Sequence, residues 1–101
     1  MRYVAYDPYD VLPYTSKTYN TIEEVMAWSI RHMEKDIYPA WADHIVKGRV
    51  NIFNIYRNGK FVGVIKRVKN DYYYTVTTVK DHNQIRNVYS VAKSGKLTKI
   101  A

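Results

Sequence analysis

The chain has 101 residues, a net charge of +7 and no cysteine, which excludes a disulfide framework and any thiolate metal site. The length fits a single domain, residues 1–101, held together by one hydrophobic core. No apolar run approaches the length of a membrane span, and the start MRYV lacks the features of a secretory signal, so we expect a cytoplasmic protein.

The charge is divided unevenly along the chain. Residues 1–46 hold four Lys/Arg against seven Asp/Glu, giving −3, whereas residues 47–101 hold twelve against two, giving +10. A basic field of this size attracts phosphate backbones or acidic protein surfaces. The alternative is that these lysines keep a sheet soluble and protect its edges. Eleven tyrosines add side chains that pack in a core or form an adhesive surface.

The N-terminal half predicts one strand and a helical layer. Residues 2–6 alternate as a short strand, and prolines then favour an ordered loop over residues 7–20. Thr21 and Glu24 form a capping box that begins a helix. The apolar stripe at helical spacing comprises Ile22, Val25, Met26, Ile30 and Met33, and Trp28 falls on the opposite side. Pro39 favours the start of a short second helix, which Gly48 ends.

The C-terminal half predicts an antiparallel sheet. Residues 49–57, 60–68 and 72–79 read as three strands, joined by the two-residue turns Asn58-Gly59 and Asn70-Asp71. Residues 85–92 and 97–100 add two more strands around a Ser94-Gly95 turn. The predicted fold class is α+β: a helical layer, one main helix plus a short second helix, packs on one face of an antiparallel β-meander of four to six strands.

The turn positions predict which residues share a face. The first turn places Phe53 opposite Val64, and the second places Lys66 opposite Thr75. The face expected to lie under the helices holds Val50, Ile52, Tyr56, Phe61, Ile65, Tyr72, Tyr74 and Val76. The opposite face, expected to be open, holds Arg49, Asn51, Phe53, Ile55, Arg57, Lys60, Val62, Val64, Lys66, Val68, Tyr73, Thr75, Thr77 and Val79.

The motifs of several enzyme and cofactor classes are absent from the sequence. The four glycines stand alone and form no phosphate-binding loop, and the three histidines have no metal-site spacing, so we expect no cofactor and no metal. One catalytic alternative is a metal-independent ribonuclease toxin, because the chain has the residue types for acid–base work on RNA: His82, Arg86, Lys66 and Tyr73.

The leading hypothesis is a non-enzymatic module that binds nucleic acid, or a protein that acts on nucleic acid, through the basic sheet. Aromatic rings would stack on bases while cations neutralise phosphates, as on single-strand-binding sheets. The candidate binding residues are Arg49, Phe53, Arg57, Lys60, Lys66, Tyr73, Lys80, His82, Arg86 and Trp28.

A protein partner explains the same residues, because a basic, tyrosine-rich surface also docks on proteins. In composition, a short cysteine-free chain rich in Tyr, Lys and Asn, the sequence resembles small accessory proteins of phages and other mobile elements. That resemblance implies an inhibitor, similar to an anti-CRISPR protein, that docks on a nuclease or defence protein inside a bacterial host.

Overall fold

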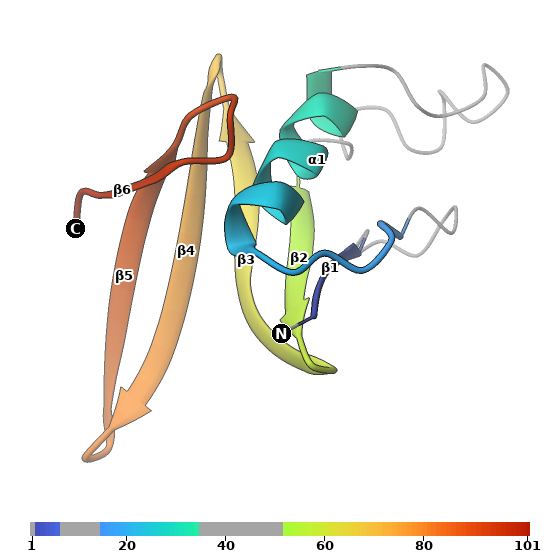
Figure 1. Ribbon diagram of the computed structural model, residues 1–101. Coiled ribbons are helices and arrows are strands. Elements are labelled where there is room, and N and C mark those ends of the chain that lie inside the picture. The colour runs from blue at the N-terminus through green and yellow to red at the C-terminus, as the bar shows by residue number, and fades with distance from the viewer. Residues whose placement is uncertain (1, 7–14, 35–51) are drawn as a thin grey trace, which may run out of the picture.

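The protein forms one helix packed on a six-stranded antiparallel sheet, as the computed structural model shows for residues 2–6, 15–34 and 52–101 (Figure 1). The strands follow one another across the sheet in chain order, so the α+β class and the meander are confirmed. The predicted second helix and Arg49 lie outside the described residues. The elements are β1 (Tyr3–Tyr6), α1 (Ile22–Glu34), β2 (Ile52–Arg57), β3 (Lys60–Val68), β4 (Asp71–Lys80), β5 (Asn83–Val91) and β6 (Leu97–Lys99).

The helix begins at the predicted capping box. The Glu24 amide donates to the Thr21 hydroxyl oxygen at 3.2 Å, and the Glu24 carboxylate accepts from the Thr21 amide at 3.2 Å and hydroxyl at 2.9 Å. These bonds satisfy amides that the first helical turn would otherwise leave without partners. The stripe Val25, Met26, Ile30 and Met33 is buried against the sheet, as predicted.

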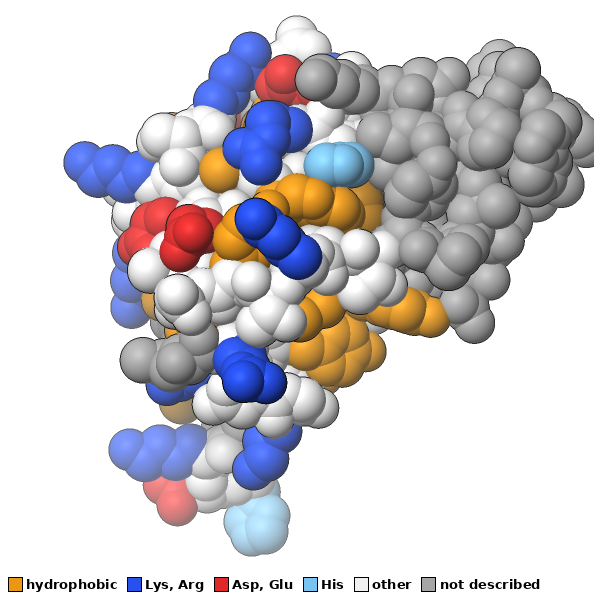
Figure 2. All heavy atoms as spheres, turned by 45° about the vertical axis from the view of Figure 1, so that its right-hand side comes forward, with side chains coloured by type: hydrophobic (Ala, Val, Ile, Leu, Met, Phe, Trp, Pro, Cys, Tyr) orange, Lys and Arg blue, Asp and Glu red, His pale blue; other side chains and the backbone are white. Residues whose placement is uncertain are grey.

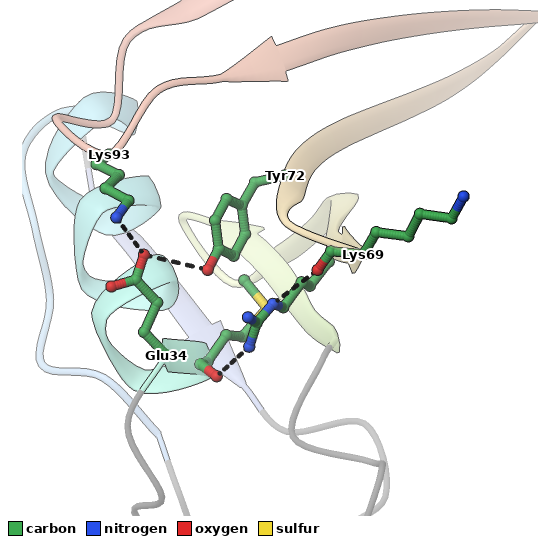
Figure 3. A network of polar contacts seen from close by, with 6 residues as sticks. Glu34, Lys69, Tyr72 and Lys93 are labelled. Atoms are coloured by element: carbon green, nitrogen blue, oxygen red, sulfur yellow. Dashed lines mark hydrogen bonds and ion pairs between the residues drawn. The ribbon is translucent and has the colours of Figure 1, made fainter.

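A small polar network joins the C-terminal end of α1 to the sheet (Figure 3). Arg67 donates to the Met33 carbonyl at 3.2 Å and to the Lys69 carbonyl at 3.1 Å, which places a cation at the negative end of the helix dipole. Glu34 accepts a hydrogen bond from the Tyr72 hydroxyl at 3.2 Å and lies 3.4 Å from the Lys93 ammonium. The helix end is therefore held by β3, β4 and the loop after β5.

The first predicted turn is correct and the second is displaced by one residue. Asn58 and Gly59 have φ angles of 50° and 81°, and Arg57 pairs with Lys60. The second loop consists of Lys69 and Asn70 rather than Asn70-Asp71, so Lys66 pairs with Tyr73 instead of Thr75. The displacement shifts the pairing of β3 with β4 by two residues. Because side chains alternate with a period of two, the same residues of β3 and β4 still share a face as predicted.

The predicted faces of β2 are wrong because β3 contains a β-bulge. Phe61 pairs with Tyr56 and Gly63 with Ile55, which leaves Val62 as an extra residue on β3. The extra residue inverts β2 relative to the prediction. Phe53 and Ile55 lie in the core, 1% and 0% exposed, whereas Phe61, expected under the helices, is 55% exposed.

The inverted register also moves the other predicted members of these faces. Ile52 and Tyr56 lie on the face away from the helix, and Val62 packs against the core instead of lying on the open face. The buried core comprises Ala5, Val25, Met26, Ile30, Met33, Phe53, Ile55, Ile65, Tyr72, Tyr74 and Val91. No helix in the described ranges is long and apolar enough to cross a membrane.

Beyond the bulge, the β2–β3 and β4–β5 hairpins separate toward their tips (Figure 1). The pairing of β3 with β4 reaches only from Val68↔Asp71 to Val64↔Thr75, while β4 remains paired with β5 as far as Lys80↔Asn83. Gly63 lies where the separation starts. A Cβ atom on Gly63 would lie 2.6 Å from the Thr75 carbonyl oxygen and 2.7 Å from the Tyr74 ring.

We expect Gly63→Ala to lower the free energy of unfolding by about 1–3 kcal/mol, because the added methyl group would overlap the Thr75 backbone. Chemical denaturation measures the effect. Gly59→Asn is the control: it also removes a glycine, but a Cβ there meets no atom within 4 Å and asparagine tolerates a positive φ. Equal stability of Gly63→Ala and the wild type would contradict the close packing of Tyr74 on this glycine.

Candidate nucleic-acid interface

A groove lies on the helix-bearing side of the sheet, beside the start of α1. It has a volume of about 380 Å³. Its lining comes from α1 and from all strands except β6: Tyr3, Ile22, Arg57, Val62, Tyr74, Val76 and Tyr89. We call it the tyrosine groove. The strands position these residues on one face, because Tyr3 pairs with Arg57 and Tyr74 pairs with Tyr89.

Three phenol groups converge in this groove. The Tyr74 and Tyr89 rings lie 6.2 Å apart with planes tilted by 33°. Burial, with smaller contributions from the neighbouring Tyr3 and Tyr89 phenols, raises the pKa of Tyr74 from 10.0 to about 12. Tyr74 is only 4% exposed, while Tyr3 and Tyr89 are half-buried. The groove therefore offers ring surface from Tyr3 and Tyr89 above a buried phenol.

Cations border the tyrosine groove on the β2–β3 side. The Arg57 guanidinium lies over the Tyr3 ring, 5.9 Å from its centroid. Arg57 and Val62 also line an adjoining recess of about 410 Å³, whose other lining residues are Asn58 and Lys60. Both Arg57 and Lys60 are exposed. The predicted site residues Arg57 and Lys60 thus lie together at the hairpin tip, next to the tyrosines.

Lys66 and Tyr73 are neighbours on the opposite face of the sheet. They are directly paired across β3 and β4, with Lys66 exposed and Tyr73 half-buried. Arg86 is also on this face, paired with Thr77 further along β4. The sequence correctly grouped Lys66 with Tyr73 on the open face, but the structure separates this pair from Arg57 and Lys60.

Lys80 and His82 lie at the tip of the β4–β5 hairpin, where the sequence predicted a loop. The strands continue to Lys80 and from Asn83, and only Asp81 and His82 form the turn, with φ angles of 53° and 65°. All residues from 77 to 86 are exposed, including Val79 at 72% and Ile85 at 42%. The tip is a two-stranded ribbon that extends beyond the helix-covered part of the sheet (Figure 1).

Phe53 and Trp28 belong to the packing of the domain rather than to an open surface. Phe53 is buried, so its ring does not reach a ligand at the surface. The Trp28 ring is stacked on His32, with centroids 3.9 Å apart, and meets the Phe53 ring edge-on at 5.3 Å. The helical spacing placed Trp28 away from the core, but its long side chain reaches Phe53 from the flank of α1.

The residues considered for ribonuclease chemistry are not gathered in one place. Thr77, the partner of Arg86, follows Tyr73 by four positions in β4, which corresponds to about 13 Å along the strand. His82 follows at the hairpin tip, more than about 20 Å from Tyr73. Within the described ranges, no three potential ligands form a group that could hold a metal ion.

No sequence pattern indicates the tyrosine groove. The alternation places Tyr74 on the face under the helices, and no motif marks Tyr3 or Tyr89. A glycine inside a strand pattern is a signal for a bulge, and Gly63 carried that signal. The bulge decides where the hairpins part, so the groove follows from it.

Hydrophobic side chains gather in the middle of the face shown in Figure 2, with Lys, Arg and acidic side chains above and to the left of them and further Lys and Arg side chains below. More cations lie at the narrow lower end of this view. The molecule thus has an α+β fold with an aromatic groove and a cationic surface. No protein family, curated protein or solved structure matches this chain.

The raised pKa of Tyr74 predicts a loss of stability in alkali. An unfolded tyrosine loses its proton near pH 10, but Tyr74 in the folded protein keeps its proton until about pH 12. The contribution of the buried, protonated Tyr74 to the free energy of unfolding is therefore fully present below pH 10. It is lost as the pH rises toward 12, by up to about 1.4 kcal/mol per pH unit. Denaturant titrations at several pH values across this range measure the effect. The free energy of unfolding should fall more steeply with pH for the wild type than for Tyr74→Phe. Tyr73→Phe, on the opposite face of β4, should retain the wild-type dependence.

Proposed function

We propose that this protein is a small, non-enzymatic binding module that engages nucleic acid through its basic, tyrosine-rich antiparallel sheet. The observation that carries the proposal is the excess of positive charge on the sheet. Residues 52–101 contain ten Lys/Arg and two Asp/Glu, a net charge of +8, and nine of the ten cations are exposed. Arg67, at the helix end, is the half-buried exception.

These cations have few acidic partners in the part of the chain that the structure describes. Among the described residues, Lys93 with Glu34 forms the one ion pair. Cations without internal counter-charges remain available to phosphate groups, and their binding releases counterions from the nucleic acid. A lysine-rich surface that serves solubility alone needs no aromatic groove beside it, whereas Arg57 and Lys60 lie next to one.

Salt dependence tests the proposal. The logarithm of the affinity for a labelled oligonucleotide should fall linearly with the logarithm of the salt concentration. Lys60→Ala should reduce that slope by about 0.7 to 0.9, the contribution of one phosphate contact. Fluorescence anisotropy measures both quantities with single- and double-stranded probes.

Lys17→Ala is the matched control for Lys60→Ala. It removes the same charge from an exposed lysine, but this lysine lies outside the sheet and over the Tyr19 ring, at 5.3 Å. The slope should keep its wild-type value in this variant. If neither probe binds the wild type at low salt, the nucleic-acid proposal is wrong.

The second candidate function is an inhibitor that docks on a nuclease or another nucleic-acid-processing protein. The β4–β5 ribbon favours it, because both of its faces are exposed and each carries an exposed aliphatic side chain, Val79 or Ile85. Such a ribbon can enter a groove on a partner protein and anchor there through apolar side chains. The cations Lys80 and Arg86 suit an acidic partner surface.

Capture from a nuclease-treated bacterial lysate distinguishes the two functions. If the protein is an inhibitor, it should capture one partner protein in stoichiometric amount even after the nucleic acid has been digested. The Val79→Asp variant should not capture this partner, because a charge would replace the apolar anchor. Thr98→Asp, which places the same charge at another exposed position, on β6, should leave capture unchanged. A complex that disappears after nuclease treatment would contradict the inhibitor function.

A further inference from the structure

We propose that the tyrosine groove binds one unpaired nucleotide of a single-stranded nucleic acid. Its base lies against Tyr3 and Tyr89, and its phosphate lies at Arg57 and Lys60. The inference rests on the proposed function and specifies two further features, the strandedness of the ligand and the residues that contact it.

The size and lining of the tyrosine groove suit a nucleobase. A volume of about 380 Å³ falls at the lower end of the range of small-ligand sites, which begins near 300 Å³. The half-buried Tyr3 and Tyr89 provide ring faces on which a base stacks, and stacking on tyrosine tolerates every base. The phenol groups that converge near Tyr74 provide hydrogen-bond donors and acceptors for base edges.

The adjoining recess suits the phosphate. Arg57 lines both recesses, so the aromatic compartment and the cationic compartment meet at one side chain. A nucleotide has the same two parts, a flat base and a charged phosphate joined by a sugar. Among the residues that the structure describes, no carboxylate lines either recess. In the first turn of α1, which starts at the groove residue Ile22, the Glu24 carboxylate is engaged by Thr21.

The arrangement of the rings favours a single strand over a duplex. The bases of a duplex are stacked on one another and present only their edges, whereas a ring platform needs the face of an unstacked base. Tyr74 is almost completely buried and lines the groove, so a ligand reaches it only by inserting a group between the surrounding side chains. An acidic peptide without aromatic residues would satisfy the cations but would present no ring to the tyrosines.

The test compares a labelled oligothymidylate with a blunt duplex of equal length by fluorescence anisotropy. The wild type should prefer the single strand. Tyr89→Ala and Arg57→Ala should each weaken single-strand binding about tenfold or more, because each removes one half of the nucleotide site. Tyr89→Phe should lose less affinity than Tyr89→Ala, since it keeps the ring that stacks on the base and removes only the hydroxyl group. Tyr73→Ala and Lys66→Ala, on the opposite face of the same sheet, are matched controls and should keep the wild-type preference for the single strand.

Tyr89 packs beside Tyr74, so thermal unfolding must first show that Tyr89→Ala is folded.

A second measurement needs no substitution. Independently of the variants, thymidine monophosphate added to the wild type should shift the ring-proton resonances of Tyr3 and Tyr89, while those of Tyr73 stay in place. Shifts confined to Tyr73 would contradict the groove assignment.

The outcomes separate this inference from the proposed function. If the wild type prefers the single strand, and only Tyr89→Ala and Arg57→Ala lose this preference, the result supports both the groove assignment and the proposed function. Salt-dependent binding that is equal for the two probes, or that is lost in Lys66→Ala and Tyr73→Ala instead, overturns the groove assignment and leaves the proposed function in place. Absence of any binding by the wild type overturns both.

Discussion

The close contact between Gly63 and Tyr74 is the constraint on which the arrangement of the sheet depends. A side chain at Gly63 would occupy the space of the Tyr74 ring and of the Thr75 carbonyl, so only glycine lets β3 approach β4 here. The bulge next to Gly63 places Val62 and Gly63 opposite a single residue, Ile55. Bulges bend and twist a strand, and β3 leaves β4 at this point. The tyrosine groove lies where the two strands have separated.

The position of α1 decides which tyrosines form the core and which line the groove. The helix has thirteen residues and is about 20 Å long, too short to cover the whole sheet. Arg67 and Glu34 hold its C-terminal end against the β3–β4 turn, where Tyr72 is buried. Its N-terminal end stops at Ile22, beside Tyr3 and Tyr89. These two rings therefore lie on the helix-bearing face with part of their surface left uncovered.

Local patterns predicted the elements that depend on local chemistry. The Thr21 capping box and the Asn58-Gly59 turn each need only a few adjacent residues, and both are confirmed. The faces of β2 could not be predicted from alternation alone, because one extra residue in β3 inverts every side chain beyond it. The groove was missed for the same reason. It gathers residues from five strands and a helix, and their proximity depends on the register of each strand pair.

Tyrosine suits a groove that is neither core nor open surface. An aliphatic lining of this size would leave an apolar patch in water, whereas a phenol packs by its ring and is solvated by its hydroxyl group. Arg57 adds a second property: it rests on the Tyr3 ring and forms no ion pair with any described residue. A phosphate that reaches this guanidinium displaces no carboxylate of a described residue, so charge attraction is not offset by the loss of such an ion pair. The geometry therefore favours an anionic, flat ligand over an aliphatic one.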